Sequence, residues 1–330
     1  GSLTMGRLFG TDGIRGIANV DLRPPLAYAL GRAVAHELTG PGGTLVVGQD
    51  TRRSGEMLVA AISAGAASLG TDVWIAGVLP TPALAFLAGS GSFAAGIMVS
   101  ASHNPADDNG LKVLDSRGLK LDELAEETIE QLIWRADELG GPRNAGIGRV
   151  AAAPGLAEHY REDRRRLAAA TPCDLHIVLD CANGAGGATA PDILAATGAR
   201  VDVIHNEPDG VNINDGCGAT APASLAAEVV IRGADLGFAL DGDADRVVLP
   251  GEPEYARIMA GESVPASPSG QRAAKPAAAP GPAAPAWASA AAPPAAAPAS
   301  PFWAAPAATP AAPPPRSAPP AAGGPAWLNG

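Results

Sequence analysis

The chain has 330 residues, enough for two or three domains of about 100 to 200 residues each. Its formal net charge is −11 and it holds no long basic run, so neither nucleic acid nor an anionic membrane is expected as its main partner. No apolar stretch approaches the roughly 20 residues that a membrane-spanning helix needs. The three cysteines, Cys173, Cys181 and Cys217, are far apart and form no CxxC pair. We therefore expect no disulfide framework and no zinc site, and the cytoplasm is the predicted compartment.

The first part of the chain alternates between apolar, strand-like runs and helical patterns. Between residues 5 and 150 these patterns predict strands at 44–50, 72–78 and 94–102, and helices at 54–70, 81–89 and 121–141. Ser54 is the expected N-cap of the first helix, and Gly70 lies just past its end. Strands that alternate with helices indicate a largely parallel sheet that helices cover on both faces.

The alternation starts again in the second part, from about residue 155 to 250. It predicts helices at 156–170, 187–198 and 221–233, and strands at 176–182, at 200–206 and from 235 into an acidic loop. The predicted fold class is therefore α/β, with two similar three-layer α/β domains built on mostly parallel, mixed sheets. We assign the first domain to residues 1–150 and the second to residues 151–263.

After about residue 264 the composition changes to alanine, proline and glycine, without one acidic residue. The stretch 264–330 holds 18 of the 32 prolines, too many for helix or sheet hydrogen bonding, so we expect a disordered, low-complexity tail. A GC-rich gene encodes such a composition when it is read out of frame, and we hypothesise that the tail arose in this way. Sequencing the coding region beyond the codon for Arg246 tests the hypothesis, because an uninterrupted frame encoding the same tail would refute it.

The sequence DGDADR places three carboxylates, Asp241, Asp243 and Asp245, at alternate positions after a predicted strand. Alternate side chains of an extended loop point the same way, so the three can converge on one hard cation such as Mg²⁺. A calcium loop of the EF-hand type is one alternative, but it needs glycine where Arg246 stands and a helix before the loop. A solvated acidic turn is the other, although three carboxylates without a metal would repel one another.

A second polar loop, SASHNP, also follows a predicted strand. It offers Ser100 and Ser102 beside His103, and an ordinary strand-to-loop turn set by Pro105 is the simplest alternative. No G-x-S-x-G sequence is present, so an α/β-hydrolase is not indicated. Ligands of open α/β sheets bind at the carboxyl ends of strands, where this loop and the acidic loop can meet. A serine oxygen could then complete the coordination of a magnesium ion held by the aspartates.

Several basic residues are candidates for binding phosphate. Arg15 lies in the glycine-rich LFGTDGIRG, and Arg52 and Arg53 precede a predicted helix start, a suitable position for an anion. For Arg53 we prefer a solvated surface charge. Lys112, on a short strand, can serve as acid, base or phosphate ligand, although an isolated lysine there is usually a surface charge. The sequence LDCANGAGG resembles a dinucleotide-binding loop but lacks its third glycine, so we interpret it as a tight strand-to-helix turn.

Five stretches taken together resemble the α-D-phosphohexomutase family. They are LFGTDGIRG, GQDTRRSGEML, SASHNPADDNGLKV, NINDGCG and DGDADR, which occur in the family's order and spacing over about residues 7 to 246. The forms FGTDGIRG and GQDTRRSGEM look most like the bacterial phosphoglucosamine mutase branch. One departure is CGATA at 217–221, where the family pattern leads us to expect a serine and a histidine.

The resemblance implies phosphoryl transfer by a phosphoserine enzyme. It makes Ser102 the residue that carries the phosphoryl group, and it implies one Mg²⁺ per chain, bound by Ser102, Asp241, Asp243 and Asp245. The implied reaction interconverts glucosamine 6-phosphate and glucosamine 1-phosphate through a 1,6-bisphosphate, with a hexose 1,6-bisphosphate as primer. The implied partner is thus a sugar phosphate, and the oligomeric state is left open.

The resemblance also assigns the residues around the serine. Arg15, His103, Lys112 and Arg246 match residues that line the family's active site. By this likeness Arg15, His103 and Lys112 take part in catalysis, with Lys112 or a neighbour handling the proton. Arg15 and Arg246 would bind phosphate.

The family pattern stops after Arg246. In these mutases a third and a fourth domain normally follow and hold the sugar and its distal phosphate. By this resemblance the chain lacks both, and we expect severely reduced or absent mutase activity from it alone. The alternatives are another phosphohexomutase activity, on mannose or glucose phosphates, a non-catalytic module that binds a divalent metal, and a nicotinamide-dependent oxidoreductase built on CANGAGG.

Overall fold

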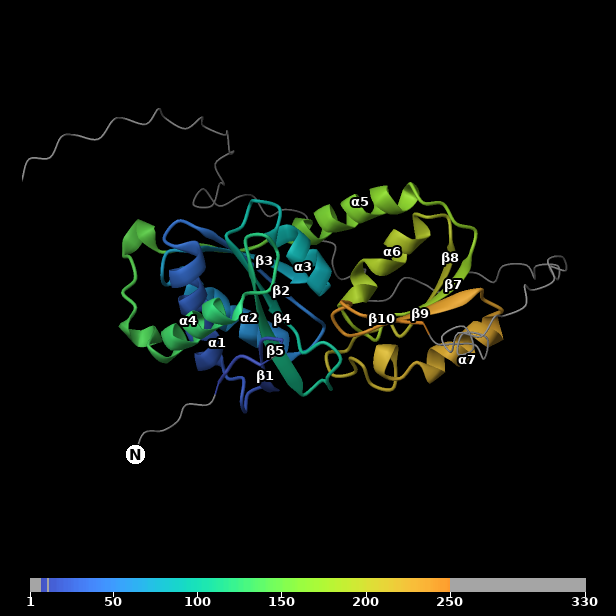
Figure 1. Cartoon of the computed structure of the whole chain (residues 1–330), viewed down its shortest axis with the longest axis horizontal. Helices are drawn as coiled ribbons and strands as arrows, with labels where there is room; N and C mark the ends of the chain where they lie inside the picture. The colour runs from blue at the N-terminus through green and yellow to red at the C-terminus, as the bar shows by residue number, and fades with distance from the viewer. Residues whose placement is uncertain (1–6, 11, 250–330) are drawn as a thin grey trace, which may run out of the picture. The chain divides into compact units, whose positions relative to one another are not determined.

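The computed structural model describes residues 7–10 and 12–249, which form two β-sheets with helices packed against them (Figure 1). The tail predicted at 264–330 and the end of the predicted second domain lie outside the described residues. Among the residues that the structure describes, no helix is both long and apolar enough to cross a bilayer.

The first sheet has six strands in the order β1-β5-β4-β2-β3-β6. They are β1 (Ile14–Ile17), β2 (Thr44–Gln49), β3 (Asp72–Val78), β4 (Ala95–Val99), β5 (Asp108–Asp115) and β6 (Val150–Ala152). Strands β4, β2, β3 and β6 are parallel, while β5 and β1 continue the sheet in antiparallel pairing. The predicted domain boundary after residue 150 falls within β6.

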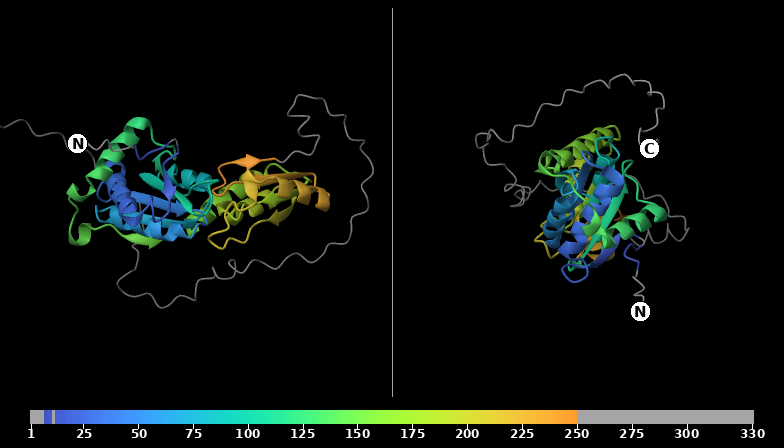
Figure 2. Two further views of the ribbon diagram at one scale, coloured as in Figure 1. Left: turned by 90° about the horizontal axis from the view of Figure 1, so that it is seen from below. Right: turned by 90° about the vertical axis from the view of Figure 1, so that its left-hand side faces the viewer.

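Helices cover both faces of this sheet (Figures 1 and 2). One face packs against α1 (Pro24–Val34), α2 (Ser54–Ala67) and α4 (Glu123–Trp134), and the other against α3 (Thr81–Ala88) and α5 (Gly155–Ala169). The side chains of β2 alternate between the two cores, because successive residues of a strand point to opposite faces. Leu45 and Val47 lie in the core under α1 and α2, and Val46 lies in the core under α3.

The second sheet has four strands in the order β10-β9-β7-β8, with β9, β7 and β8 parallel and β10 antiparallel. They are β7 (His176–Asp180), β8 (Arg200–Ile204), β9 (Leu236–Leu240) and β10 (Val247–Val248). Helix α7 (Ala223–Arg232) buries Leu225 and Val229 against this sheet, and α6 (Ala190–Ala195) contacts β8 and α5. The predicted class, α/β with mixed and mostly parallel sheets, is confirmed.

Short helical turns connect these elements. They are a π-helical turn η1 (Ala35–Thr39) and the 3-10 turns η2 (Ala136–Glu138), η3 (Asn144–Gly146), η4 (Ala185–Ala188) and η5 (Gly218–Thr220).

Three local features differ from the sequence-based expectation. Ser54 is not the N-cap of α2 but its first residue, and its Oγ accepts a hydrogen bond from Asn109 Nδ2 at 2.8 Å instead of capping the helix. Strand β4 ends at Val99, three residues earlier than predicted, so the following serines belong to a loop. Strand β1 and helix α1 were not predicted, although the two prolines of α1 stand in its first turn, where a helix tolerates proline.

The carboxyl ends of parallel strands from both sheets are joined by hydrogen bonds. Thr51, just after β2, donates through Oγ1 to the carbonyl of Asn183, just after β7, at 2.6 Å. The backbone N–H of Thr81, at the start of α3, donates to the carbonyl of Asp243, just after β9, at 2.9 Å. The polar loops singled out in the sequence therefore meet at one place, as the rule for open α/β sheets predicts.

Candidate active site

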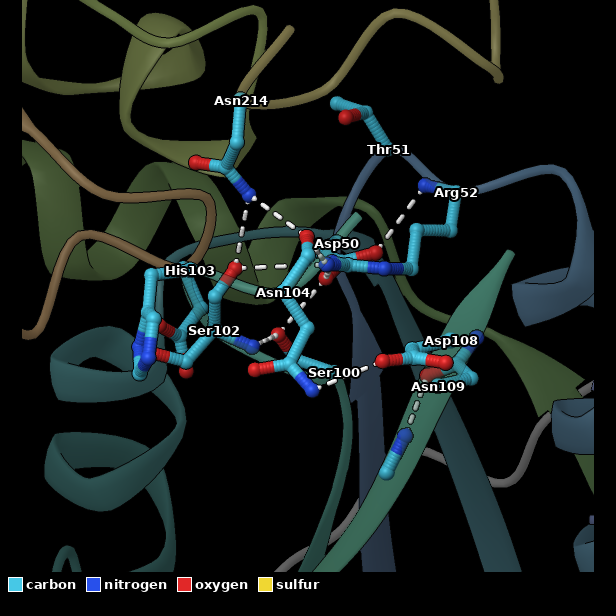
Figure 3. Close-up of polar contacts among 12 residues, drawn as sticks. Asp50, Thr51, Arg52, Ser100, Ser102, His103, Asn104, Asp108, Asn109 and Asn214 are labelled. Atoms are coloured by element: carbon cyan, nitrogen blue, oxygen red, sulfur yellow. Dashed lines mark hydrogen bonds and ion pairs between the residues drawn. The ribbon is translucent and has the colours of Figure 1, made fainter. Parts of the chain in front are cut away.

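The loop after β4 holds Ser102 in a fixed and strained conformation (Figure 3). Ser102 is fully buried and has φ +54°, in the left-handed region that a residue with a side chain seldom adopts. Its backbone N–H donates to Ser100 Oγ at 2.9 Å, and Ser100 Oγ donates in turn to Asp50 Oδ2 at 2.6 Å. The strain is sustained because these buried contacts determine the position of the loop.

A buried ion pair anchors the same loop from the end of β2. The side chains of Asp50 and Arg52 are both 0% exposed, and the guanidinium NH1 of Arg52 contacts Asp50 Oδ2. The NH2 group of Arg52 donates to the carbonyls of Asn104 at 2.5 Å and of Ser102 at 3.3 Å (Figure 3). Arg52 therefore neutralises a buried carboxylate and fixes the backbone around Ser102.

Residues from two loops between strands of the second sheet complete the support of the serine loop. Asn214 donates through Nδ2 to the carbonyl of Ser102 at 2.9 Å and to that of Asn104 at 3.1 Å (Figure 3). The backbone of Gly242 approaches so closely that a Cβ there would lie 2.6 Å from the carbonyl oxygen of Ser102. A glycine is required at this position because a side chain would collide with the serine loop.

The acidic loop after β9 brings its carboxylates to the serine. Ser102 Oγ donates to Asp241 Oδ2 at 2.5 Å, and one oxygen from each of Asp241, Asp243 and Asp245 lies within 4.8 Å of the others. Burial raises the pKa of Asp241 to about 7, and the negative charges of Asp243 and Asp245 add to the effect. Four oxygens, one from a serine and three from carboxylates, thus converge on one point.

The oxygens of this cluster suit a hard divalent cation. Asp243 is 0% exposed, and its Oδ1 is a buried oxygen without a hydrogen-bond partner, while its Oδ2 accepts from Thr81 Oγ1 at 2.6 Å. A buried carboxylate oxygen without a partner is costly unless a cation binds it. The all-oxygen donor set and the crowded negative charge fit Mg²⁺, so the residues present are compatible with the metal that the resemblance implies.

Lys112 faces the acidic loop from strand β5. Its Nζ lies 2.9 Å from Asp243 Oδ2, 3.1 Å from Asp12 Oδ2 and 3.4 Å from Asp245 Oδ2. Burial alone would lower the pKa of Lys112, but these three carboxylates outweigh it and hold the pKa above its ordinary value. Asp12 also binds the NH2 group of Arg15 at 2.5 Å, so Arg15 and Lys112 stand side by side as fixed cations.

His103 lies beside Ser102 and also contacts Arg246. His103 Nδ1 is 3.3 Å from Ser102 Oγ, and Arg246 donates through NH1 to the same nitrogen at 2.6 Å. Burial lowers the pKa of His103, and the charges of Arg246 and Arg15 lower it further, so the imidazole is neutral at neutral pH. His103 also lines a cavity of about 390 Å³ together with Pro105 and Asn214.

Contacts of 4 Å or less link the eight residues that the resemblance assigns to the site, Arg15 through Asp12 and Asn104. These eight are Arg15, Ser102, His103, Lys112, Asp241, Asp243, Asp245 and Arg246. Arg15 joins the group through Asp12 and, at 3.4 Å, through Asn104 of the serine loop.

Two arginines at the start of α2 behave differently from each other. Contrary to the expectation of an anion-binding role, the guanidinium of Arg52 is buried and paired with Asp50, so its charge does not face a ligand. Arg53 is exposed, as preferred, and its backbone N–H donates to the carbonyl of Gly210 at 2.9 Å.

Sequence reasoning missed the supporting roles of Asp50 and Asn214. The sequence could have revealed the role of Asp50, since Asp50 is a carboxylate at the end of a predicted buried strand, two residues before an arginine. Asn214 lies in NINDGCG, one of the five stretches of the resemblance, but the stretch does not reveal its role, because the carbonyls to which Asn214 donates belong to a loop more than a hundred residues away.

Comparison with known proteins assigns the family. The model of the phosphoglucomutase/phosphomannomutase alpha/beta/alpha domain I matches residues 6–140, and that of domain II matches residues 157–252. The chain belongs to the phosphoglucomutase/phosphomannomutase family. The predicted resemblance to phosphohexomutases is thus confirmed, and the acidic loop and the serine loop both fall within the matched residues.

Relatives of known name agree with this assignment. A phosphoglucosamine mutase from Pelotomaculum thermopropionicum is 49% identical over 249 residues, which are 74% of this chain and 56% of that protein. One from Mycolicibacterium gilvum is 47% identical over 264 residues, or 79% of this chain and 59% of that protein. The crystal structure of a family member from Burkholderia thailandensis superposes with a TM-score of 0.63 at 29% identity, covering 74% of this chain and 54% of its own. The chain therefore spans a little over half the length of these relatives.

Proposed function

We propose that this chain carries the phosphoryl-transfer centre of a phosphoglucosamine mutase. The observation that carries the proposal is the hydrogen bond of 2.5 Å from Ser102 Oγ to Asp241, within a group of three carboxylates, two of them buried, that basic side chains surround. The reaction would interconvert glucosamine 6-phosphate and glucosamine 1-phosphate through a phosphoserine and a 1,6-bisphosphate. The likeness to phosphoglucosamine mutases at 47–49% identity supports this choice of sugar.

One Mg²⁺ would be held by Ser102 and the three aspartates of the acidic loop. When bound, it would stabilise the negative charge that spreads over the oxygens of the phosphoryl group during transfer. Without it, the four carboxylates of Asp12, Asp241, Asp243 and Asp245 outnumber the three fixed cations, Arg15, Lys112 and Arg246, around Ser102. A divalent ion reverses that balance, so that the dianionic phosphate of a substrate can approach the serine.

The basic side chains have separate tasks in this proposal. Arg15 and Arg246 would bind the oxygens of the phosphate, since a planar guanidinium can donate two hydrogen bonds to them. Lys112 stays an ammonium among its carboxylates and can donate a proton to the sugar oxygen that leaves. His103 is neutral and 3.3 Å from Ser102 Oγ, so it can accept the proton of the serine or of a sugar hydroxyl.

These side chains account for every bond and proton in phosphate transfer from a hexose 1,6-bisphosphate primer to Ser102. The bond from phosphorus to Ser102 Oγ forms as the Oγ–H bond breaks and its proton passes to His103, while the bond from phosphorus to the sugar oxygen breaks and that oxygen receives a proton from Lys112. Positioning and neutralised charge provide most of the catalysis of such a step.

We place this isomerase in the cytoplasm, where it would supply amino-sugar precursors for the cell wall.

The test separates the chemistry at the serine from complete turnover. The chain is incubated with Mg²⁺ and glucose 1,6-bisphosphate, and intact mass spectrometry follows the addition of one phosphoryl group. We expect one group per chain, absent in Ser102→Ala and retained in Ser90→Ala, a control at an exposed serine. Failure of Ser102 to acquire phosphate under these conditions would overturn the proposal and favour a non-catalytic metal-binding module.

A second assay identifies the sugar. The same chain, with Mg²⁺ and the primer, is given glucosamine 6-phosphate, mannose 6-phosphate or glucose 6-phosphate, and the 1-phosphate product is measured. Because mutase activity of this chain alone is expected to be severely reduced, the assay is run at high protein concentration, and the proposal expects the amino sugar to give the highest kcat/KM of the three. A preference for mannose or glucose phosphate would keep the chemistry and refute the choice of substrate.

A further inference from the structure

A second group of metal-binding side chains lies in the second sheet. It consists of Asp180, His205 and Cys217, each of which brings one ligand atom within 4.8 Å of the other two. Asp180 is the last residue of β7, His205 follows β8, and Cys217 precedes η5. The sequence predicted no zinc site because no two cysteines are close along the chain. Here, however, the ligands come from three separate segments that the sheet brings together.

The histidine faces the carboxylate without a proper hydrogen bond between them. Nδ1 of His205 lies 3.1 Å from Asp180 Oδ2, yet this buried nitrogen has no partner with the alignment of a hydrogen bond. Within the described residues, Asp180 has no lysine or arginine partner in an ion pair. If Nδ1 carries a lone pair, that pair and the carboxylate oxygen repel each other unless a cation lies between them. His205 also has φ +47°, so its backbone adopts the left-handed conformation that a residue with a side chain seldom takes.

The other two ligands are already oriented. Asp180 is 0% exposed and accepts hydrogen bonds from the backbone N–H of Ala182 at 2.9 Å and of Gly218 at 2.8 Å. Each carboxylate oxygen has two lone pairs, so these bonds fix the group and leave capacity for a metal. The thiol of Cys217 is buried, and within residues 7–10 and 12–249 its one hydrogen bond is a long contact of 3.9 Å from Asn183 Nδ2.

We propose that Asp180, His205 and Cys217 bind one borderline transition-metal ion of the Zn²⁺ class. Imidazole nitrogen, thiolate sulfur and carboxylate oxygen are the three ligand types that Zn²⁺ takes in proteins, whereas Mg²⁺ takes oxygen alone. The side chain of His205 is 34% exposed, which gives an ion access from that side and room for a water as fourth ligand. The site is independent of the acidic loop and of the proposed mutase function.

Binding must remove a proton from the cysteine. Burial raises the pKa of the Cys217 thiol to about 12, and the charge of Asp180 adds to the effect, so the metal-free thiol is protonated at neutral pH. A metal ion binds the thiolate, and the displaced proton passes to the solvent.

An ion at this site would connect the serine loop to the second sheet. His205 and Cys217 stand at the two ends of the segment 205–217, and that segment carries Asn214, which donates to the carbonyl of Ser102. A metal that ties both ends to Asp180 would restrict the motion of this segment. The consequence is a second, softer metal centre that stabilises the backbone from which Asn214 reaches the serine loop.

Co²⁺ is the probe that tests the site, because it replaces Zn²⁺ and its absorption reports a sulfur ligand. The whole chain is stripped with a chelator and titrated with Co²⁺ in excess Mg²⁺, which occupies the acidic loop. We expect one equivalent of Co²⁺ to produce a thiolate-to-cobalt charge-transfer band, and Zn²⁺ to displace it. Residues 250–330 contain no histidine or cysteine and cannot produce this signal.

Variants decide whether the band arises from these residues. Cys217→Ser should abolish it, whereas Cys173→Ser, at a half-buried cysteine beside Thr197, should leave it intact. His205→Gln should weaken Co²⁺ binding by more than the roughly 10- to 100-fold that the loss of a group supporting a ligand costs. No band in the unmodified chain, or a band that survives Cys217→Ser, overturns the proposal. Should Cys217→Ser fail to fold, an unchanged affinity in His205→Gln overturns it instead.

Discussion

Replacing Arg52 by methionine removes the cation from a pair whose side chains are both 0% exposed. The carboxylate of Asp50 then stays buried without a counter-charge, and the carbonyls of Ser102 and Asn104 lose a donor. Removal of one partner from a buried ion pair costs about 3–5 kcal/mol. We expect the free energy of unfolding to fall by this amount, a large share of the roughly 5–15 kcal/mol that stabilises a domain.

The loss should depend on pH in a defined direction. Burial raises the pKa of Asp50, and the guanidinium of Arg52 opposes this effect, so the folded-state pKa rises further in Arg52→Met. An acid whose pKa is raised on folding contributes stability that is complete below its unfolded pKa and lost as the pH rises through the folded pKa. The variant should therefore lose less stability, relative to the unmodified chain, at about pH 5 than at about pH 8.

Urea denaturation followed by circular dichroism measures both effects. Arg135→Met is the matched control, since Arg135 is 69% exposed and its loss should stay within about 0.5 kcal/mol. The double variant Asp50→Asn/Arg52→Met leaves no buried charge at this pair, so it should recover part of the lost unfolding free energy. The reasoning is refuted if Arg52→Met loses less than about 1 kcal/mol, or if the double variant is no more stable than the single one.

Three further predictions concern the serine and metal loops. With Asp241 at a folded pKa of about 7, raised by burial and by neighbouring carboxylates, its contribution to the stability of the Mg²⁺-free chain is complete below the unfolded pKa and lost as the pH rises through about 7. Mg²⁺ should consequently raise the unfolding temperature more at about pH 8 than at about pH 6, and equal shifts would contradict this account. Gly242→Ala places a Cβ 2.6 Å from a carbonyl oxygen and should cost about 1–3 kcal/mol in urea denaturation, whereas Gly155→Ala, with open space around it, should cost nothing measurable. Asn214→Asp puts a carboxylate against two carbonyl oxygens and should slow phosphorylation of Ser102 more than Asn214→Ala does, as followed by intact mass over time.

The sequence by itself determined the class of fold and most of the candidate site. Alternating apolar runs and helical patterns predicted two sheets of mostly parallel strands, because such strands are buried on both faces and leave a strong local signal. Alternate spacing identified Asp241, Asp243 and Asp245 as a group, and the resemblance of the SASHNP stretch to a phosphohexomutase motif identified Ser102. These features are local in the chain, so short stretches of sequence reveal them.

Only the tertiary structure decided which charges support the backbone and which face a ligand. Arg15 and Arg52 both lie in polar, glycine-containing stretches, yet folding buries Arg52 against Asp50 and leaves Arg15 beside Asp12 at the site. The grouping of Asp180, His205 and Cys217 was equally hidden, since it depends on two strand ends and a loop meeting at one sheet. Burial and contacts between distant segments fix the charge, the hydrogen-bond partners and the backbone strain of a side chain, and no local pattern in the sequence encodes them.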